Sequence, residues 1–91
     1  MLELYIENSY KHDLKRVVKQ DIKADITKET IDKLQNEIKL DKRQHEHPLI
    51  GDYAGYMECK ILPDLLLIYK IKDGCLHLVR IGSHSELFKK Y

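Results

Sequence analysis

The amino-acid sequence predicts an α+β domain in which one strand and two helices precede an antiparallel meander of three strands. Apolar residues recur at helical spacing in the first half of the chain, whereas three apolar runs of strand length occupy the second half. Short turn signals, Pro63-Asp64 and Asp73-Gly74, separate these runs. Helices and strands that are segregated along a chain are typical of α+β proteins. With 91 residues the chain has the size of one small domain, residues 1–91.

The first half is predicted to hold a strand followed by a helical hairpin. Residues 2–7, LELYIE, alternate apolar and polar side chains as a half-buried strand does. Asn8 or Ser9 can cap the first helix. Its apolar side carries Tyr10, Leu14, Val17 and Val18. A turn at 21–25 then leads to a second helix over about 25–39. The apolar side of this helix carries Thr27, Ile31, Leu34 and Ile38. Two short adjacent helices favour a hairpin.

The second half is predicted to hold a polar loop and then the meander. The loop covers 41–55, and the strands cover 56–61, 65–71 and 75–81. Asp-Gly between the last two runs is a strong hairpin signal. The middle run, LLLIY, is apolar on both faces, so we expect it to be the central strand. The N-terminal strand joins the same sheet, and a short helical turn begins at Ser85.

Composition excludes several classes of protein. The net charge is +1, which is not the footprint of a general nucleic-acid binder, although six basic and three acidic residues follow from Lys60 onward. The N-terminus lacks the pattern of a signal peptide, and no apolar run is long enough to span a bilayer. We therefore expect a cytoplasmic protein. Cys59 and Cys75 lack metal-ligand spacing and are expected to be free, buried thiols.

Strand alternation gathers polar residues on one face of the predicted sheet. Alternate residues of a strand point to opposite faces, so Lys60 lies on one face and Asp64 continues that side beyond the strand. In the last strand Arg80, Gly82 and, by extension, His84 share a face. The glycine leaves a gap between the arginine and the histidine where a ligand could approach closely.

These residue types fit phosphodiester cleavage without a metal. That reaction needs a base for the 2′-hydroxyl proton, an acid for the leaving 5′-oxygen and positive charge against the phosphorane. Histidine can serve as acid or base, and arginine offers a planar charged fork to phosphate oxygens. The 2′-hydroxyl requirement makes RNA the substrate. Four polar residues on a sheet face are, however, more often just a solvated face.

Three blocks in the second half resemble one family of proteins. They are HPLIG at 47–51, ECKILPDLLLIY at 58–69 and RIGSHSELF at 80–88. In this order and with these gaps they resemble the YafQ branch of the RelE-type toxins, the toxin halves of bacterial toxin–antitoxin pairs. The first half resembles the family only in its length and its strand–helix–helix order.

The resemblance implies a RelE-like fold and a ribosome-dependent endoribonuclease that cuts mRNA in the ribosomal A site. Its products carry a 2′,3′-cyclic phosphate and a 5′-hydroxyl. The implied partners are the ribosome, mRNA and a cognate antitoxin, with no membrane, no metal and no cofactor. The family's functional positions fall on His47, Asp64, Arg80 and His84 as catalytic residues, and on Lys60 and Phe88 as substrate-binding residues.

Two positions depart from the family pattern. Lys60 stands where the family usually has a histidine, and Leu65 stands where an aromatic residue is frequent. An unperturbed lysine has a pKa near 10.4 and is a poor base, so we expect Lys60 to stabilise charge. Proton transfer then falls to His84 with Asp64 or His47. The loss of a stacking aromatic at Leu65 is expected to weaken substrate placement.

Other interpretations remain open at this point. Asp64 can merely shape the turn after Pro63, and Phe88 can pin the C-terminal turn to the core. A ParE-type relative shares the scaffold but poisons DNA gyrase by binding, because fold does not fix function. A toxin weakened by Lys60 is a third interpretation.

Overall fold

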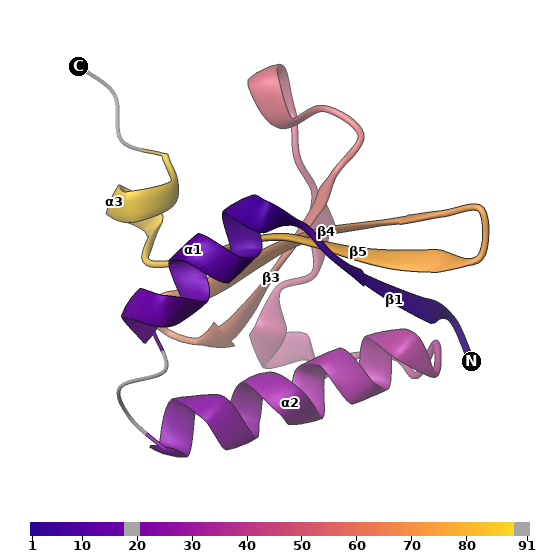
Figure 1. Ribbon diagram of the computed structural model, residues 1–91, viewed down its shortest axis with the longest axis horizontal. Helices are drawn as coiled ribbons and strands as arrows, with labels where there is room; N and C mark the ends of the chain where they lie inside the picture. Colours follow the sequence, from indigo (N-terminus) through magenta and orange to yellow (C-terminus); the bar gives the residue numbers. More distant parts are fainter. Residues whose placement is uncertain (18–20, 89–91) are drawn as a thin grey trace.

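The chain folds into a single five-stranded sheet with two helices packed on one side (Figure 1). The structure is a computed structural model, and it describes residues 1–17 and 21–88. Its elements in chain order are β1 (Glu3–Ile6), α1 (Asn8–Val17), α2 (Asp21–Gln35), the 3₁₀ turn η1 (Lys42–Gln44), β2 (His47–Pro48), the 3₁₀ turn η2 (Gly51–Tyr53), β3 (Met57–Leu62), β4 (Leu65–Lys72), β5 (Cys75–Gly82) and α3 (His84–Leu87). The predicted α+β class and strand–helix–helix–meander order are confirmed.

The strand order across the sheet is β1-β5-β4-β3-β2. β1 runs parallel to β5, and every other neighbouring pair is antiparallel. β4 therefore lies in the middle, as its apolar sequence predicts, and its residues Leu65–Tyr69 are all buried. β1 is the outer strand, so its four residues are exposed instead of half-buried. Among the described helices, none is long and apolar enough to cross a membrane.

β4 separates two apolar clusters. Alternate residues of the strand enter the main core beneath α1 and α2, which also contains Tyr10, Leu34, Cys59, Leu76, Leu78 and Ile81. The opposite residues, Leu66 and Ile68, enter a smaller cluster with Val79 and Leu87. Leu49, Tyr53, Tyr56 and Phe88 pack against the smaller cluster. This smaller cluster is the floor of the face that carries the candidate site.

A bulge in β5 changes which side chains reach that face. Ile68 is opposite Arg80 and Tyr69 is opposite Leu78, so Val79 is an extra residue in β5. A bulge breaks strict alternation because two residues of one strand oppose one residue of its partner. Leu78 therefore enters the main core, whereas Val79 enters the smaller cluster and Arg80 lies in register with Ile68.

Besides the burial of β1, four local predictions are wrong. Residues 21–25 are the first residues of α2, so the helix begins and ends about four residues earlier than expected. The turn predicted at 21–25 is therefore wrong. Val18, which was predicted on the apolar side of the first helix, lies outside the described residues. The helix ends because Glu37 has a φ of 56° and donates its N–H to Leu34, while Ile38 donates to Lys33. This pair of bonds is a Schellman motif, which usually contains glycine. Ile38 is consequently 55% exposed.

The other three differences concern the loop, the C-terminal helix and a thiol. His47 and Pro48 form the short strand β2 against Met57 and Glu58, where a loop is predicted. α3 begins at His84 rather than at Ser85. Both cysteines are free as predicted, but only Cys59 is buried, and burial raises the pKa of its thiol to about 12.

Candidate functional site

Sheet register places His47, Glu58, Ile68 and Arg80 in one row across four strands. Neighbouring strands lie about 4.8 Å apart, so the backbones of His47 and Arg80 are separated by roughly 14 Å. The next row contains Lys60, Leu66 and Gly82. Two apolar residues of the central strand therefore separate the polar groups of β3 from those of β5.

Arg80 is the most firmly held polar side chain on this face. Its Nε donates to Asp13 Oδ2 at 2.6 Å and its Nη2 donates to Asp13 Oδ1 at 3.1 Å. The hydrogen bond to Asp13 is the largest effect raising the pKa of Arg80 above its ordinary value; burial opposes it, and a hydrogen bond with Tyr53 adds to it. The side chain is 26% exposed, so the guanidinium reaches the surface while two of its nitrogens are occupied.

His84 is the first residue of α3, and its imidazole is exposed beside an aromatic ring. Ser83 caps the helix: its hydroxyl accepts the Glu86 N–H at 3.2 Å, and the Glu86 carboxylate accepts the Ser83 N–H at 2.8 Å. The ring of His84 lies 5.0 Å from that of Phe88, centroid to centroid. This capping box places His84 two residues beyond Gly82, at the end of the strand that carries Arg80.

Aromatic rings line the face beside Arg80. Phe88 meets Tyr53 edge to face at 5.7 Å, and Tyr53 meets Tyr56 in the same way at 6.0 Å. Lys70 Nζ lies 5.1 Å from the centroid of the Tyr56 ring. Phe88 is half-buried against the smaller cluster, so it both pins α3 and presents part of its ring at the surface. Ring faces of this kind can stack with nucleic-acid bases.

His47 lies at the far end of the same row, paired with a carboxylate. Its Nε2 lies 3.4 Å from Glu58 Oε1, and its Nδ1 lies 2.6 Å from the His45 carbonyl oxygen. Both ring nitrogens thus face oxygen atoms, which fix the plane of the ring. Glu58 is 8% exposed, and a buried carboxylate of this kind can fix the orientation of a histidine ring.

Lys60 and Asp64 lie apart from the polar and aromatic side chains described above. Asp64 is exposed in the turn between β3 and β4, and within the described ranges neither the Lys60 nor the Asp64 side chain has a hydrogen bond or ion pair. Lys60 borders a cavity of about 590 Å³ at the open edge of β3, together with Lys33, Arg43 and His45. The structure therefore places Arg80, His84 and Phe88 on the β5 side of the face, where Tyr53 contacts Arg80 and Phe88, and Phe88 contacts His84. It leaves His47, Lys60 and Asp64 at the opposite side of the face.

The chain matches the model of a family described as the bacterial toxin of the type II toxin–antitoxin system, YafQ, over residues 2–89. The chain belongs to the YafQ toxin family. The mRNA interferase toxin YafQ of Escherichia coli K12 is 38% identical over 55 residues, which is 60% of each chain. The putative toxin YafQ of Haemophilus influenzae is 37% identical over 57 residues, 58% of this chain and 56% of that one. The aligned segment thus spans somewhat less than two thirds of these curated relatives.

Solved structures of bacterial toxins resemble the whole fold. The metal-bound toxin from Helicobacter pylori is 39% identical, with a TM-score of 0.88 over 97% of this chain and 100% of that one. The toxin in the E. coli DinJ–YafQ toxin–antitoxin complex is 31% identical, with a TM-score of 0.84 over 96% of this chain and 97% of that one. The family expected from the three blocks is therefore confirmed, and the likeness extends through the first half of the chain.

Two features of this YafQ-family chain bear on chemistry. Leu65 is 3% exposed and lies in the main core. Its side chain therefore does not reach the face of the sheet that carries the candidate site, where an aromatic residue at this position was expected to stack with RNA. In the part of the chain that the structure describes, no three His, Cys, Asp or Glu residues are grouped so as to hold a metal ion.

Sequence reasoning missed three residues that shape the site. Asp13 holds Arg80, Glu58 faces His47, and Tyr53 joins Arg80 to the aromatic rings. Helical periodicity places Asp13 one position from the apolar residue Leu14, and nothing in that pattern indicates a partner 67 residues away. Glu58 could have been predicted only by recognising that β2 pairs with β3, which places His47 opposite Glu58. The proline in β2 argues against a strand, so this pairing was missed.

Proposed function

We propose that this YafQ-family chain is an endoribonuclease that cuts mRNA on the ribosome and thereby stops translation. The observation that carries the proposal is that β5 holds Arg80 and runs directly into α3, which begins at His84, with aromatic rings beside them. The gap expected at Gly82 is filled, because a Cβ there would lie 3.0–3.4 Å from side-chain atoms of Glu86, Arg16 and Leu87. The name of the E. coli relatives, mRNA interferase toxin, supports the same activity.

The proposed reaction is an internal attack within the RNA chain. A base removes the proton of a 2′-hydroxyl, and the 2′-oxygen attacks the adjacent phosphorus. The bond from phosphorus to the 5′-oxygen breaks, and an acid gives that oxygen a proton. The products are a 2′,3′-cyclic phosphate and a 5′-hydroxyl. No electrons are gained or lost overall, and no group besides the RNA and protein side chains is required.

Arg80 and His84 take the central roles in this reaction. The free edge of the Arg80 guanidinium binds the phosphate oxygens and stabilises the additional negative charge of the phosphorane. His84 is exposed just beyond the end of the strand that carries Arg80, and it transfers a proton to or from the reacting oxygens. Phe88, whose ring lies against His84, stacks with a base next to the scissile phosphate.

His47, Asp64 and Lys60 serve from the β3 side of the face. The second proton-transfer group is either His47, which Glu58 holds, or Asp64. Lys60 contributes positive charge along the RNA backbone. Because these residues lie about two to three strand spacings from Arg80, the bound RNA spans the sheet from β3 to β5.

The proposed partners follow from this activity. The ribosome presents the mRNA, so the protein acts in the cytoplasm. A cognate antitoxin holds it silent, as the E. coli DinJ–YafQ complex suggests for a relative. A segment that folds on binding would cover the basic face and exclude RNA.

Cell-free translation followed by primer extension tests the proposed function. The wild-type protein should produce new 5′ ends within translated codons, and His84→Ala should abolish them. His12→Ala is the matched control, because His12 is an exposed histidine on α1, and it should cut like the wild type. Intact mRNA together with inhibited DNA supercoiling would instead support a gyrase-binding toxin, and full cutting by the His84 variant would remove this residue from the mechanism.

A further inference from the structure

We propose that Asp13 is a positioning residue that fixes the orientation in which Arg80 meets the substrate phosphate. The inference rests on the proposed ribonuclease function and goes beyond the residues that the sequence motifs indicate. Asp13 lies on α1, in the half of the chain that carries none of the three motif blocks, and it is 3% exposed.

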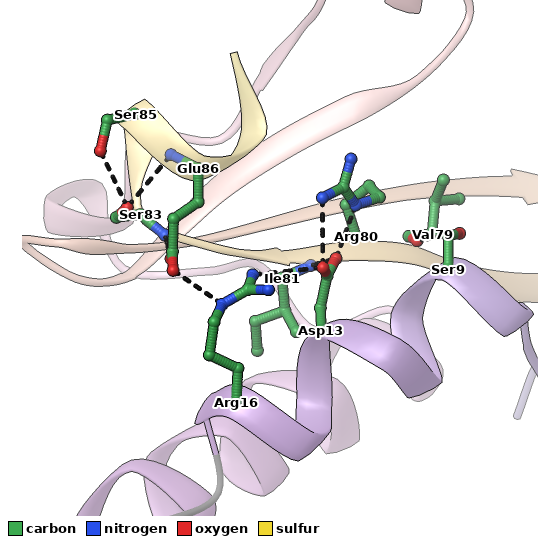
Figure 2. A network of polar contacts seen from close by, with 9 residues as sticks. All are labelled: Ser9, Asp13, Arg16, Val79, Arg80, Ile81, Ser83, Ser85 and Glu86. Atoms are coloured by element: carbon green, nitrogen blue, oxygen red, sulfur yellow. Dashed lines mark hydrogen bonds and ion pairs between the residues drawn. The ribbon is translucent and has the colours of Figure 1, made fainter. Parts of the chain in front are cut away.

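The Asp13 carboxylate is fully engaged (Figure 2). Oδ2 accepts from Arg80 Nε at 2.6 Å and from the Ile81 backbone N–H at 3.1 Å. Oδ1 accepts from Arg80 Nη2 at 3.1 Å and from Arg16 Nη2 at 3.2 Å. Two parallel bonds between a carboxylate and a guanidinium restrain its plane as well as its position.

The charge on Asp13 is stabilised by these contacts. Burial alone would raise the pKa of the Asp13 carboxyl, but the hydrogen bonds from Arg80, the Ile81 N–H and Arg16 outweigh that effect and lower the pKa. The carboxyl is therefore ionised at neutral pH. It acts as a fixed anion under Arg80.

The structure also explains why a helix lies close enough to hold Arg80. β1 ends at Ile6, so the second half of β5 has no strand on that side. α1 covers this edge instead, and its side chains replace the missing strand: Ser9 Oγ donates to the Val79 carbonyl at 2.6 Å, and Asp13 accepts from Ile81. Asp13 thus has a structural task as well, which an experiment has to separate from positioning.

The hydrogen bonds to Asp13 determine which N–H groups Arg80 can donate to an RNA phosphate. Nε and one Nη2 hydrogen of the guanidinium are committed to Asp13, and Tyr53 hydrogen-bonds the same group, so a phosphate has to use the remaining N–H groups on the side away from Asp13. A phosphate must then approach from that side. Without the anion the long arginine side chain would sample several rotamers, and a displacement of about 1 Å can lower a catalysed rate by roughly 100-fold.

Arg16 connects α1 to the short helix that begins at His84. It lies three residues after Asp13 on α1, and its Nε donates to Glu86 Oε2 at 2.7 Å. Glu86 belongs to the capping box of α3, which begins at His84. One face of α1 therefore touches both the arginine and the helix of the histidine (Figure 2).

The test compares Asp13→Asn with Ser9→Ala in single-turnover cleavage of ribosome-bound mRNA. Asparagine keeps the size of Asp13 but loses its charge and one acceptor, so we expect the rate of cleavage to fall roughly 10- to 100-fold. Half-saturation should change by less than about threefold, because the lost anion does not contact RNA. Ser9→Ala removes a neighbouring bond to the same strand edge without touching Arg80, and it should cleave like the wild type.

A double-mutant cycle separates positioning from general destabilisation. In an Arg80→Ala background, Asp13→Asn should have no further effect on the residual rate, because the group that it positions is absent. An equal rate loss with and without Arg80 would overturn the proposal. So would a wild-type rate in Asp13→Asn, or the same rate loss in Ser9→Ala.

A measurement on the wild-type protein distinguishes this inference from the proposed function. The Arg80 Nε–H should give a resolved NMR signal at neutral pH that exchanges slowly with water, as a short bond to a carboxylate requires. Rapid exchange would refute positioning by Asp13 even if the protein cuts RNA or the asparagine variant fails to fold. A slow signal in a protein that does not cut RNA would refute the proposed function alone.

Discussion

Removal of the Ser83 hydroxyl should loosen α3 and, with it, the site histidine. The helix has four residues, and its capping box is a reciprocal pair of bonds at 3.2 and 2.8 Å between Ser83 and Glu86. Loss of such a cap costs about 1 kcal/mol. Leu87 is 6% exposed, and its burial, about 1.5–3 kcal/mol, keeps the helix docked. Ser83→Ala should therefore open α3 about five times more often without unfolding the domain.

Amide hydrogen exchange reports this opening directly. The N–H groups of Leu87 and Phe88 donate to the carbonyls of Ser83 and His84, so both should exchange about fivefold faster in Ser83→Ala. Ser85→Ala is the matched control. Ser85 contacts the Ser83 hydroxyl at 3.3 Å but caps nothing, and its loss should stay within about 0.5 kcal/mol. Unchanged exchange in Ser83→Ala, or equal effects of the two variants, would refute the assignment of Ser83 as the cap.

Three further predictions concern stability. Leu67→Ala, at a residue with 0% exposure in β4, should lower the free energy of unfolding in urea by about 2–5 kcal/mol, and a loss below 1 kcal/mol would contradict the central place of β4. Gly82→Ala puts a Cβ 3.0 Å from Glu86 Oε1 and 3.1 Å from Arg16 Nη2, so it should displace the ion pair between these residues and lower the free energy of unfolding by about 1 kcal/mol or less. The NMR chemical shift of the Arg16 Nε–H should change, and an unchanged shift would contradict this prediction. The lowered pKa of Asp13 contributes stability that is present above its unfolded pKa of about 3.9 and is lost as the pH falls through its folded pKa. Below about pH 4 the free energy of unfolding should therefore fall less steeply in Asp13→Asn than in the wild type, and parallel titration curves for the two proteins would contradict this.

Patterns that depend on neighbours in the sequence predicted most of the fold. The continuous apolar run LLLIY identified the central strand, and the Asp-Gly pair identified the hairpin of β4 and β5. The end of α2 was missed because Glu37 adopts the left-handed conformation that glycine usually signals. The helical spacing of apolar residues continues through Ile38, but the helix ends earlier because of the Schellman hydrogen bonds and the hydrogen bonds between Gln35 and Leu2.

The site was predictable only where the motifs lie. The last strand indicated that Arg80 and His84 are neighbours, since both follow from one short segment. The bulge at Val79 and the bond between Asp13 and Arg80 depend on how distant parts of the chain meet, and residue type alone does not encode them. The sequence also predicted that Lys60 and Asp64 share a face with Arg80 across the central strand, and the register of β3, β4 and β5 places Leu66 and Ile68 of that strand between them.

Cleavage of an mRNA with a single 2′-deoxynucleotide tests the central claim most directly. The mutual position of Arg80 and His84 supports a reaction in which the 2′-oxygen itself attacks the phosphorus. Once primer extension has located a cut site in ribosome-bound mRNA, the deoxynucleotide is placed on the 5′ side of that bond. The proposed mechanism predicts that cutting stops at this site and continues at unmodified sites. Continued cutting at the deoxynucleotide would contradict it.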